Sequence, residues 1–232
     1  QSRLPRSCLS ANLIPADPAQ PGERLSSNSP PKADLFVTCI IDQLYPQVGV
    51  SVVRVLRRLG VDVSFQEDQT CCGQPAYNAG MRQNARAIAE QVITAFAGFD
   101  YVVAPSGSCA AMIKVHYPQL LGGDGARDLA ARTHELIEFL VDVRGVQDVS
   151  ARLDGAAAYH DSCSGLRELG IKDQPRALLA TVDGLSQSDY QGAETCCGFG
   201  GLFCVKYPDI ANKMADDRLR DIENSGADYL LG

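Results

Sequence analysis

The sequence contains no run of about 18 consecutive apolar residues, the length that a helix needs to cross a bilayer. No transmembrane segment is therefore predicted. The N-terminal region has no apolar stretch followed by a small-residue cleavage site, so a secretory signal is not indicated and a reducing, cytoplasmic compartment is expected. The net charge is -7 and the basic residues form no cluster, which argues against nucleic acid as a partner. A Gly-x-Gly-x-x-Gly motif is also absent, so no nicotinamide or flavin site is expected within the chain.

Cysteine, by contrast, is abundant, with nine residues in a chain of 232. In a reducing compartment such a set is more often metal-binding or catalytic than disulfide-bonded. Two adjacent cysteines also form a strained disulfide with each other, because the ring that they close is short. Hydrophobic residues make up 45% of the chain, which is enough for a core without disulfides. The cysteines are therefore expected to serve a site rather than to staple the fold.

The motif Thr-Cys-Cys-Gly occurs twice, at residues 70–73 and 195–198. A single cysteine precedes each copy: Cys39 lies 32 residues before the first pair, and Cys163 lies 33 residues before the second. The offset between corresponding residues then grows only from 124 at these single cysteines to 128 where Gly-Phe-Asp-Tyr is echoed by Gly-Ala-Asp-Tyr. The chain is predicted to consist of two related units.

The two units and their flanking segments can be assigned from composition. Residues 1–33 are rich in proline and polar residues and predict a disordered tail, in which Cys8 has no counterpart and is expected to be a bystander. The first unit is assigned to residues 34–143 and the second to residues 156–232, with a linker at residues 144–155.

Within each unit, strand patterns alternate with helix patterns. This order predicts an α/β fold in which each unit has a mainly parallel sheet flanked by helices. Every repeated cysteine follows a predicted strand, and ligands in such folds bind outside the carboxyl ends of the strands. The predicted strands are residues 34–38, 61–65, 100–104, 156–160, 185–190 and 228–231, and the predicted helices are residues 44–59, 82–96, 126–143, 175–182 and 208–224.

Adjacent cysteines suit an iron–sulfur cluster better than a single zinc ion. Zinc sites usually use Cys-x-x-Cys spacing, which lets both sulfurs turn toward one ion, whereas a cluster presents several irons to neighbouring thiolates. The glycine after each pair lets backbone N–H groups approach the sulfurs. Zinc binding and thiol redox chemistry remain as alternatives. The first unit offers the four thiolates that a [4Fe-4S] cluster requires: Cys39, Cys71, Cys72 and Cys109.

Over residues 34–232, these motifs resemble the cysteine-rich CCG domain family, which includes a cysteine-rich subunit of heterodisulfide reductase and the iron–sulfur subunit of glycolate oxidase. The resemblance is carried by five stretches: Cys-Ile-Ile-Asp-Gln-Leu-Tyr-Pro from Cys39, Gln-Thr-Cys-Cys-Gly-Gln-Pro from Gln69, Pro-Ser-Gly-Ser-Cys from Pro105, His-Asp-Ser-Cys from His160, and Cys-Cys-Gly-Phe-Gly-Gly from Cys196.

The resemblance implies an iron–sulfur subunit that transfers electrons in a multi-protein system oxidising L-lactate to pyruvate without NAD. It also implies partners that are other iron–sulfur or flavin subunits. By similarity, the four cysteines of the first unit would hold one [4Fe-4S] cluster, while Cys163, Cys196 and Cys197 would belong to a second. A disulfide-reducing subunit and a glycolate oxidase subunit are the alternatives within the same family.

The sequence departs from the family pattern at three places. Ser106 stands where heterodisulfide reductase has a fifth cysteine, which argues against transfer of its unusual cluster and its chemistry. Ser164 follows Cys163 where relatives typically carry histidine. The counterpart of Cys109 would fall near position 237, past the last residue of the sequence, so the second unit is interpreted as truncated. Cys204 could substitute as a ligand, but a packing role is favoured for it.

The remaining polar candidates have weaker signals. His160 and Asp161 lie beside Cys163, where they could orient a substrate or relay a proton, or simply form structural hydrogen bonds. Arg167 could bind a carboxylate as a bidentate fork, or could be a solvated arginine at a helix start. His116 and His134 fall on predicted helices without the spacing of metal ligands, so neither is expected to bind a metal.

Overall fold

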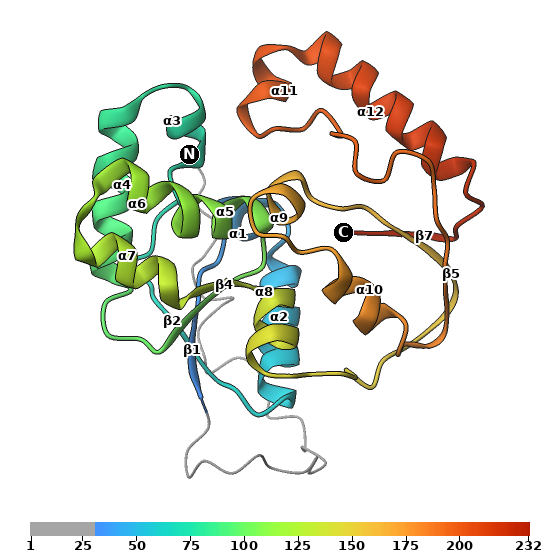
Figure 1. The fold of residues 1–232 in the computed structure, drawn as a ribbon, viewed down its shortest axis with the longest axis horizontal. Coiled ribbons are helices and arrows are strands. Elements are labelled where there is room, and N and C mark those ends of the chain that lie inside the picture. The colour runs from blue at the N-terminus through green and yellow to red at the C-terminus, as the bar shows by residue number, and fades with distance from the viewer. Residues whose placement is uncertain (1–30) are drawn as a thin grey trace.

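The computed structural model describes residues 31–232, which form two parallel β-sheets with helices around them (Figure 1). The first sheet has the order β2-β1-β3-β4, and the second has the order β6-β5-β7. Every pair of neighbouring strands is parallel, which confirms the predicted α/β fold. The strands are β1 (Lys32–Leu35), β2 (Asp62–Phe65), β3 (Tyr101–Ala104), β4 (Thr133–Glu135), β5 (Arg152–Tyr159), β6 (Asp183–Gln187) and β7 (Tyr229–Leu231).

The two sheets share one topology. In each, the first strand of the unit lies between the next two strands of the chain, so that β5, β6 and β7 correspond to β1, β2 and β3. The register is also regular, with Leu35 opposite Phe65 on one side and Val103 on the other. This correspondence agrees with the duplication inferred from the cysteine motifs.

Helices cover both faces of the first sheet, because successive side chains of each strand point to opposite faces. Phe36, Val102 and Ala104 pack on one face with α4 and α7, and the alternate residues Leu35 and Val103 pack on the other face with α2. The helical elements of this unit are α1 (Cys39–Leu44), α2 (Pro46–Arg58), α3 (Gln74–Asn78), α4 (Arg82–Ala95), α5 (Gly107–Ala111), the π-helical η2 (Met112–His116), α6 (Tyr117–Leu121), α7 (Gly123–Arg132), α8 (Leu136–Glu138) and the π-helical η3 (Phe139–Val143).

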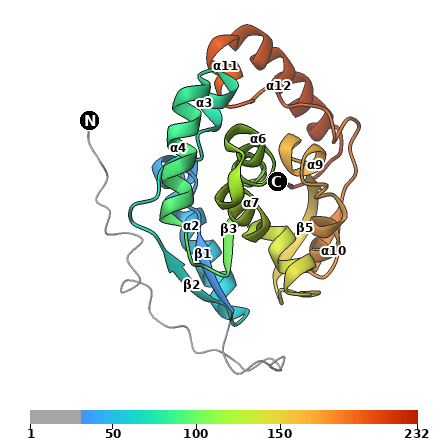
Figure 2. The same cartoon turned by 60° about the vertical axis from the view of Figure 1, so that its left-hand side comes forward.

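The second unit is smaller, with α9 (Cys163–Arg167), α10 (Asp173–Leu179), α11 (Leu202–Lys206) and α12 (Pro208–Glu223). Helix α12 is the long red helix at the outer side of this unit in both views (Figures 1 and 2). The two units meet where α5 packs against α9. Helix α5 carries Cys109, and α9 begins with Cys163.

The prediction of one continuous helix over residues 126–143 is wrong. The segment instead divides into α7, the strand β4, α8 and η3. Thr133–Glu135 pairs with β3, with Val102 opposite Thr133, and the Thr133 side chain is fully buried. Pairing with a neighbouring strand outweighs the local helix pattern here, since strand preference depends on tertiary surroundings. His134 consequently lies on a strand rather than on a helix.

Several other predicted boundaries shift. Strand β1 begins at Lys32, within the segment predicted to be a tail, and Ala33 is fully buried. The rest of that segment, residues 1–30 with Cys8, lies outside the described residues. The predicted helix at residues 44–59 becomes α1 and α2, and Val48 of α2 is 39% exposed. Strand β5 starts inside the predicted linker.

Three other predicted elements match the structure closely, whereas the predicted strand at residues 185–190 lies at Asp183–Gln187 and the predicted helix at residues 175–182 lies at Asp173–Leu179. The predicted helices at residues 82–96 and 208–224 correspond to α4 and α12, and the predicted strand at residues 100–104 corresponds to β3. Among the described residues, the longest apolar helical stretches are too short or too polar to cross a bilayer.

Candidate metal centre

The four cysteines of the first set lie on segments that leave the same edge of the first sheet. Cys39 is the first residue of α1, beyond β1; the Cys71–Cys72 pair lies in the loop after β2; and Cys109 lies in α5, after β3. Because parallel strands end at one edge, the three segments converge there. The Thr38 hydroxyl caps α1 by accepting a hydrogen bond from the Ile41 amide at 3.4 Å. This cap defines where α1 starts and therefore where Cys39 sits.

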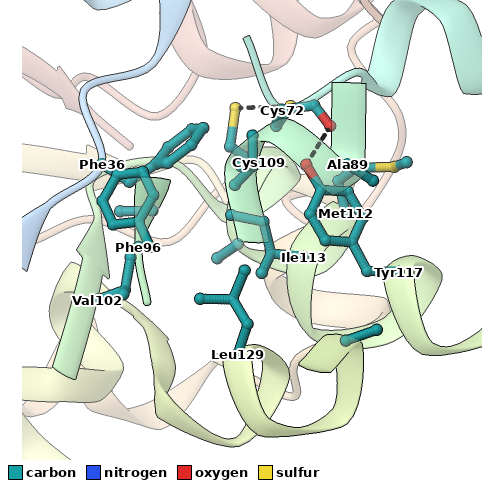
Figure 3. Packing of buried hydrophobic residues seen from close by; sticks show 14 residues of the cluster. Phe36, Cys72, Ala89, Phe96, Val102, Cys109, Met112, Ile113, Tyr117 and Leu129 are labelled. Carbon is teal, nitrogen blue, oxygen red and sulfur yellow. Dashed lines mark hydrogen bonds between the residues drawn. The ribbon is translucent and has the colours of Figure 1, made fainter. Parts of the chain in front are cut away.

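The sulfur atoms of this set form two close pairs. The Sγ atoms of Cys71 and Cys39 are 3.7 Å apart, and those of Cys72 and Cys109 are 3.4 Å apart. Both distances are far longer than a disulfide bond of about 2 Å, and all four cysteines are free. Figure 3 shows Cys72 and Cys109 side by side at the upper edge of the apolar cluster. The structure thus brings together all four residues predicted for this site.

The protonation of the four thiols is interdependent. Hydrogen bonding to the Cys71 sulfur, together with burial, raises the pKa of Cys39. Hydrogen bonding to Cys109 and Cys71 raises the pKa of Cys72. Hydrogen bonds from Cys39 and Cys72 lower the pKa of Cys71, and a hydrogen bond from Cys72 lowers that of Cys109. Each pair thus contains one sulfur that favours the thiolate, and binding of all four to a metal would release protons.

Side chains from distant segments hold these loops in place. The Gln69 amide accepts a hydrogen bond from the Val37 amide at 2.8 Å and donates to the Leu35 carbonyl at 3.2 Å, tying the loop after β2 to the end of β1. The buried Tyr117 hydroxyl donates to the Cys72 carbonyl at 2.8 Å (Figure 3). Sequence reasoning missed Tyr117, because it lies 45 residues from Cys72 and belongs to no motif.

The glycine after each cysteine pair has the same conformation in both units. Gly73 and Gly198 have φ values of +82° and +83°, a region that favours glycine. The Gly73 amide donates to the Cys71 sulfur at 3.5 Å, and the Gly198 amide donates to the Cys196 sulfur at 3.4 Å. A backbone N–H aimed at a cysteine sulfur is the contact that tunes iron–sulfur clusters. The repeat therefore preserves a specific geometry and not only a residue pattern.

The second set is brought together less completely. Cys163 is the first residue of α9, where the Ser162 hydroxyl caps the helix by accepting from the Gly165 amide at 3.1 Å. Burial, followed by hydrogen bonding to Cys196, raises the pKa of Cys163. The charge of the Cys197 sulfur also raises the pKa of Cys163. Cys204 lies within α11, and its thiol donates to the Gly201 carbonyl at 3.1 Å.

The weaker polar candidates have structural partners. Asp161 is buried and receives two hydrogen bonds from Arg176, at 2.8 and 2.6 Å, and the His160 ring lies 3.2 Å from the Tyr190 hydroxyl. Arg167 donates to the Glu194 carbonyl at 3.1 Å.

The two histidines that were not expected to bind a metal pair with carboxylates instead. His134 lies 3.3 Å from Glu138, and His116 lies 2.7 Å from Glu168 of the other unit. No motif or spacing indicated this last contact between the units.

The donor chemistry of the first set fits an iron–sulfur cluster. Three of its thiols, those of Cys71, Cys72 and Cys109, lie in or beside an apolar core, and a backbone amide faces the Cys71 sulfur. Among residues 31–232, no group of three or more His, Cys, Asp or Glu side chains is already arranged to hold a metal ion. The second set provides three thiols in the described part of the chain, one fewer than a [4Fe-4S] cluster uses.

Comparison with known proteins agrees with this geometry. The family model for the CCG cysteine-rich domain matches residues 33–114 and residues 157–232, one match for each cysteine set. This chain belongs to the CCG cysteine-rich domain family. Members similar to it include lactate utilization protein A of Geobacillus kaustophilus, which is 52% identical over 206 residues, covering 87% of this chain and 86% of the relative.

Two further relatives carry the same name. The protein of Geobacillus thermodenitrificans is 50% identical over 206 residues, and that of Bacillus pumilus is 49% identical over the same length. Both alignments cover 87% of this CCG chain and 86% of the relative. The similarity therefore extends over most of the chain.

Proposed function

We propose that this CCG protein is the iron–sulfur electron-transfer subunit of a system that oxidises L-lactate to pyruvate. The observation that carries the proposal is the convergence of the Cys39, Cys71, Cys72 and Cys109 sulfurs at one sheet edge, in two pairs at 3.7 and 3.4 Å. The choice of lactate is supported by the name of the relatives, which are lactate utilization proteins A.

In this proposal, the four cysteines of the first unit hold one [4Fe-4S] cluster, which supplies one-electron transfer when bound. The Gly73 amide donates to the Cys71 sulfur, and Tyr117 fixes the Cys72 carbonyl. Cys72 and Cys109 are buried, which keeps water away from those two sulfurs. Cys163, Cys196 and Cys197 belong to a second site that requires a fourth ligand to hold a cluster of the same kind.

The substrate chemistry is assigned to partner subunits. The sequence has no nucleotide-binding glycine motif, so a flavin or a further iron–sulfur subunit would exchange electrons with this chain. We place the system in the cytoplasm, where free cysteines persist. A disulfide-reducing role is the alternative, and it predicts that the isolated protein reduces a disulfide.

Iron and acid-labile sulfide, measured per chain after purification without oxygen, test the cofactor assignment. We expect about four of each, with broad visible absorption near about 400 nm. Cys109→Ser should remove most of the iron, whereas Cys204→Ser, a matched change in the second unit, should leave it unchanged. Stoichiometric zinc in a colourless protein would contradict the assignment.

Bleaching of the visible absorption tests the reaction. L-lactate added to the isolated chain without oxygen should leave the absorption unchanged, because the substrate is oxidised by a partner. Lactate together with the purified partner subunits should bleach it as electrons arrive. Bleaching of the isolated chain by lactate would instead assign the oxidation to this chain, and reduction of a disulfide by that chain would favour the alternative role.

A further inference from the structure

A solvent-open hollow lies on the first unit, outside the cysteine sets. It has a volume of about 430 Å³ and is lined by Tyr77 of α3, Arg82 and Arg86 of α4, and Gln119 and Leu120 of α6. Helix α4 contacts both α3 and α6, and the three helices lie near one another in both ribbon views (Figures 1 and 2). Helix α3 begins two residues after Cys72, so the hollow adjoins the loop that carries the first cysteine pair.

The two arginines are held in position before any ligand arrives. The Arg82 guanidinium carbon lies 3.8 Å from the centre of the Tyr77 ring. Tyr77 in turn stacks on His116, with 4.8 Å between the ring centres. The Arg86 guanidinium donates to the Leu120 carbonyl. Side chains that are already ordered lose less conformational entropy when a ligand binds.

The charges around the hollow are not balanced within the described residues. Neither Arg82 nor Arg86 forms an ion pair with a carboxylate in residues 31–232. Arg82 is also the first residue of α4, which has no acidic residue in its first turn and no side-chain cap. A helix N-terminus carries partial positive charge, so the arginines add to it.

Other arginines of the chain are placed differently. Arg57 and Arg58 lie in the last turn of α2, where the helix dipole favours a positive charge. The chain as a whole carries a charge of -7. The hollow therefore presents two positive side chains on a chain whose net charge is negative.

We propose that this hollow docks an acidic segment of a partner protein, with its carboxylates on Arg82 and Arg86. An open hollow suits a protein segment, whereas small-molecule sites are usually enclosed. Met81, which is 53% exposed, directly precedes Arg82 and offers apolar contact beside the charges. The segment would bind next to the first cysteine set. This docking goes beyond the proposed function and does not need a bound cluster.

Binding of a labelled, end-blocked hexaglutamate peptide at low salt, followed by fluorescence anisotropy, tests the proposal. The double variant R82Q/R86Q should bind at least about tenfold more weakly than the natural chain, since charge-assisted bonds to both arginines are lost. The control is R54Q/R57Q, which removes two exposed arginines of α2 and changes the net charge equally. Its affinity should stay within about twofold of the natural value.

The outcomes separate the alternatives. Failure of the natural chain to bind the peptide, or equal weakening in the two double variants, would overturn the proposal. Displacement of the peptide by inorganic phosphate at equal concentration would also overturn it, in favour of a small-anion site. Circular dichroism verifies that the variants are folded. The same titration on cluster-free and cluster-loaded protein distinguishes failure of docking from failure of the electron-transfer assignment.

Discussion

Gly107 lies directly against Gly165, across the boundary between the two units. A Cβ atom on Gly107 would lie 2.9 Å from the Gly165 nitrogen, 3.0 Å from its Cα, and 2.6 Å from the Ser162 hydroxyl. Helix α5, which contains Gly107, also carries Cys109, and α9, which contains Gly165, begins with Cys163. The contact therefore joins the supports of the two cysteine sets.

Alanine at position 107 should strain this boundary. We expect Gly107→Ala to lower the free energy of unfolding by about 1–3 kcal/mol, because its methyl group would meet backbone atoms that cannot turn aside. Urea denaturation measures the change. Gly125→Ala is the matched control, since its Cβ would lie 3.4 Å from the Ile93 side chain, an ordinary contact in α7. Equal stability of the two variants would contradict the expectation.

The two motif glycines should differ in their tolerance of alanine. Both have positive φ, but a Cβ on Gly198 would lie 2.7 Å from the Ala211 carbonyl oxygen, whereas on Gly73 it would lie 3.2 Å from the Cγ2 methyl group of the Ile88 side chain. We expect Gly198→Ala to destabilise the protein more than Gly73→Ala, by about 1 kcal/mol or more. Thermal or urea unfolding of the two variants side by side gives the comparison, and the reverse order would show that α12 moves aside.

Tyr117 should stabilise the loop of the first cysteine pair. The change Tyr117→Phe removes the hydroxyl that donates to the Cys72 carbonyl at 2.8 Å and leaves that buried acceptor unpaired. The expected loss in the free energy of unfolding is about 1–3 kcal/mol. Tyr45→Phe, at a residue that is 53% exposed, provides the control. If both variants unfold at the same urea concentration as the natural chain, the hydrogen bond has no net stabilising effect.

Glu135 should make stability depend on pH. Burial raises the pKa of its carboxyl group to about 7 in the folded protein, from an ordinary value of 4.5. Between these values the folded state holds a proton that the unfolded state has lost, so the free energy of unfolding falls as pH rises. The Glu135→Gln variant has no carboxyl group at this position, so its free energy of unfolding should not fall in this way. The difference between the variant and the natural chain should therefore grow in favour of the variant between pH about 5 and about 8, by at most about 3 kcal/mol.

Denaturation series at several pH values measure this effect. The exposed Glu90 of α4 provides a control, because Glu90→Gln is the same substitution at a carboxyl group that is exposed in the folded protein. A Glu135→Gln curve parallel to the natural one across the whole range would show that the carboxyl group has the same proton affinity in both states.

Local patterns predicted the elements with strong periodicity and clear ends. Helix α4 was expected at residues 82–96 and spans Arg82–Ala95, with Ala85, Ala89 and Val92 buried on one side of the helix. Strand β4 was missed, because Thr133–Glu135 is short and is stabilised by its pairing with β3 rather than by its own composition. The short helix α1 was missed as well, since six residues are too few for a periodic pattern.

The amino-acid sequence alone predicted the duplication, the parallel α/β class and the set of cysteines at strand ends. These features follow from residue identity and spacing along the chain, which indicate where each strand ends and where each cysteine emerges. Folding in three dimensions determined which sulfurs pair, that Tyr117 supports Cys72, that Gly107 meets Gly165, and that two arginines line an open hollow. Such contacts join residues tens of positions apart, and packing alone brings them together.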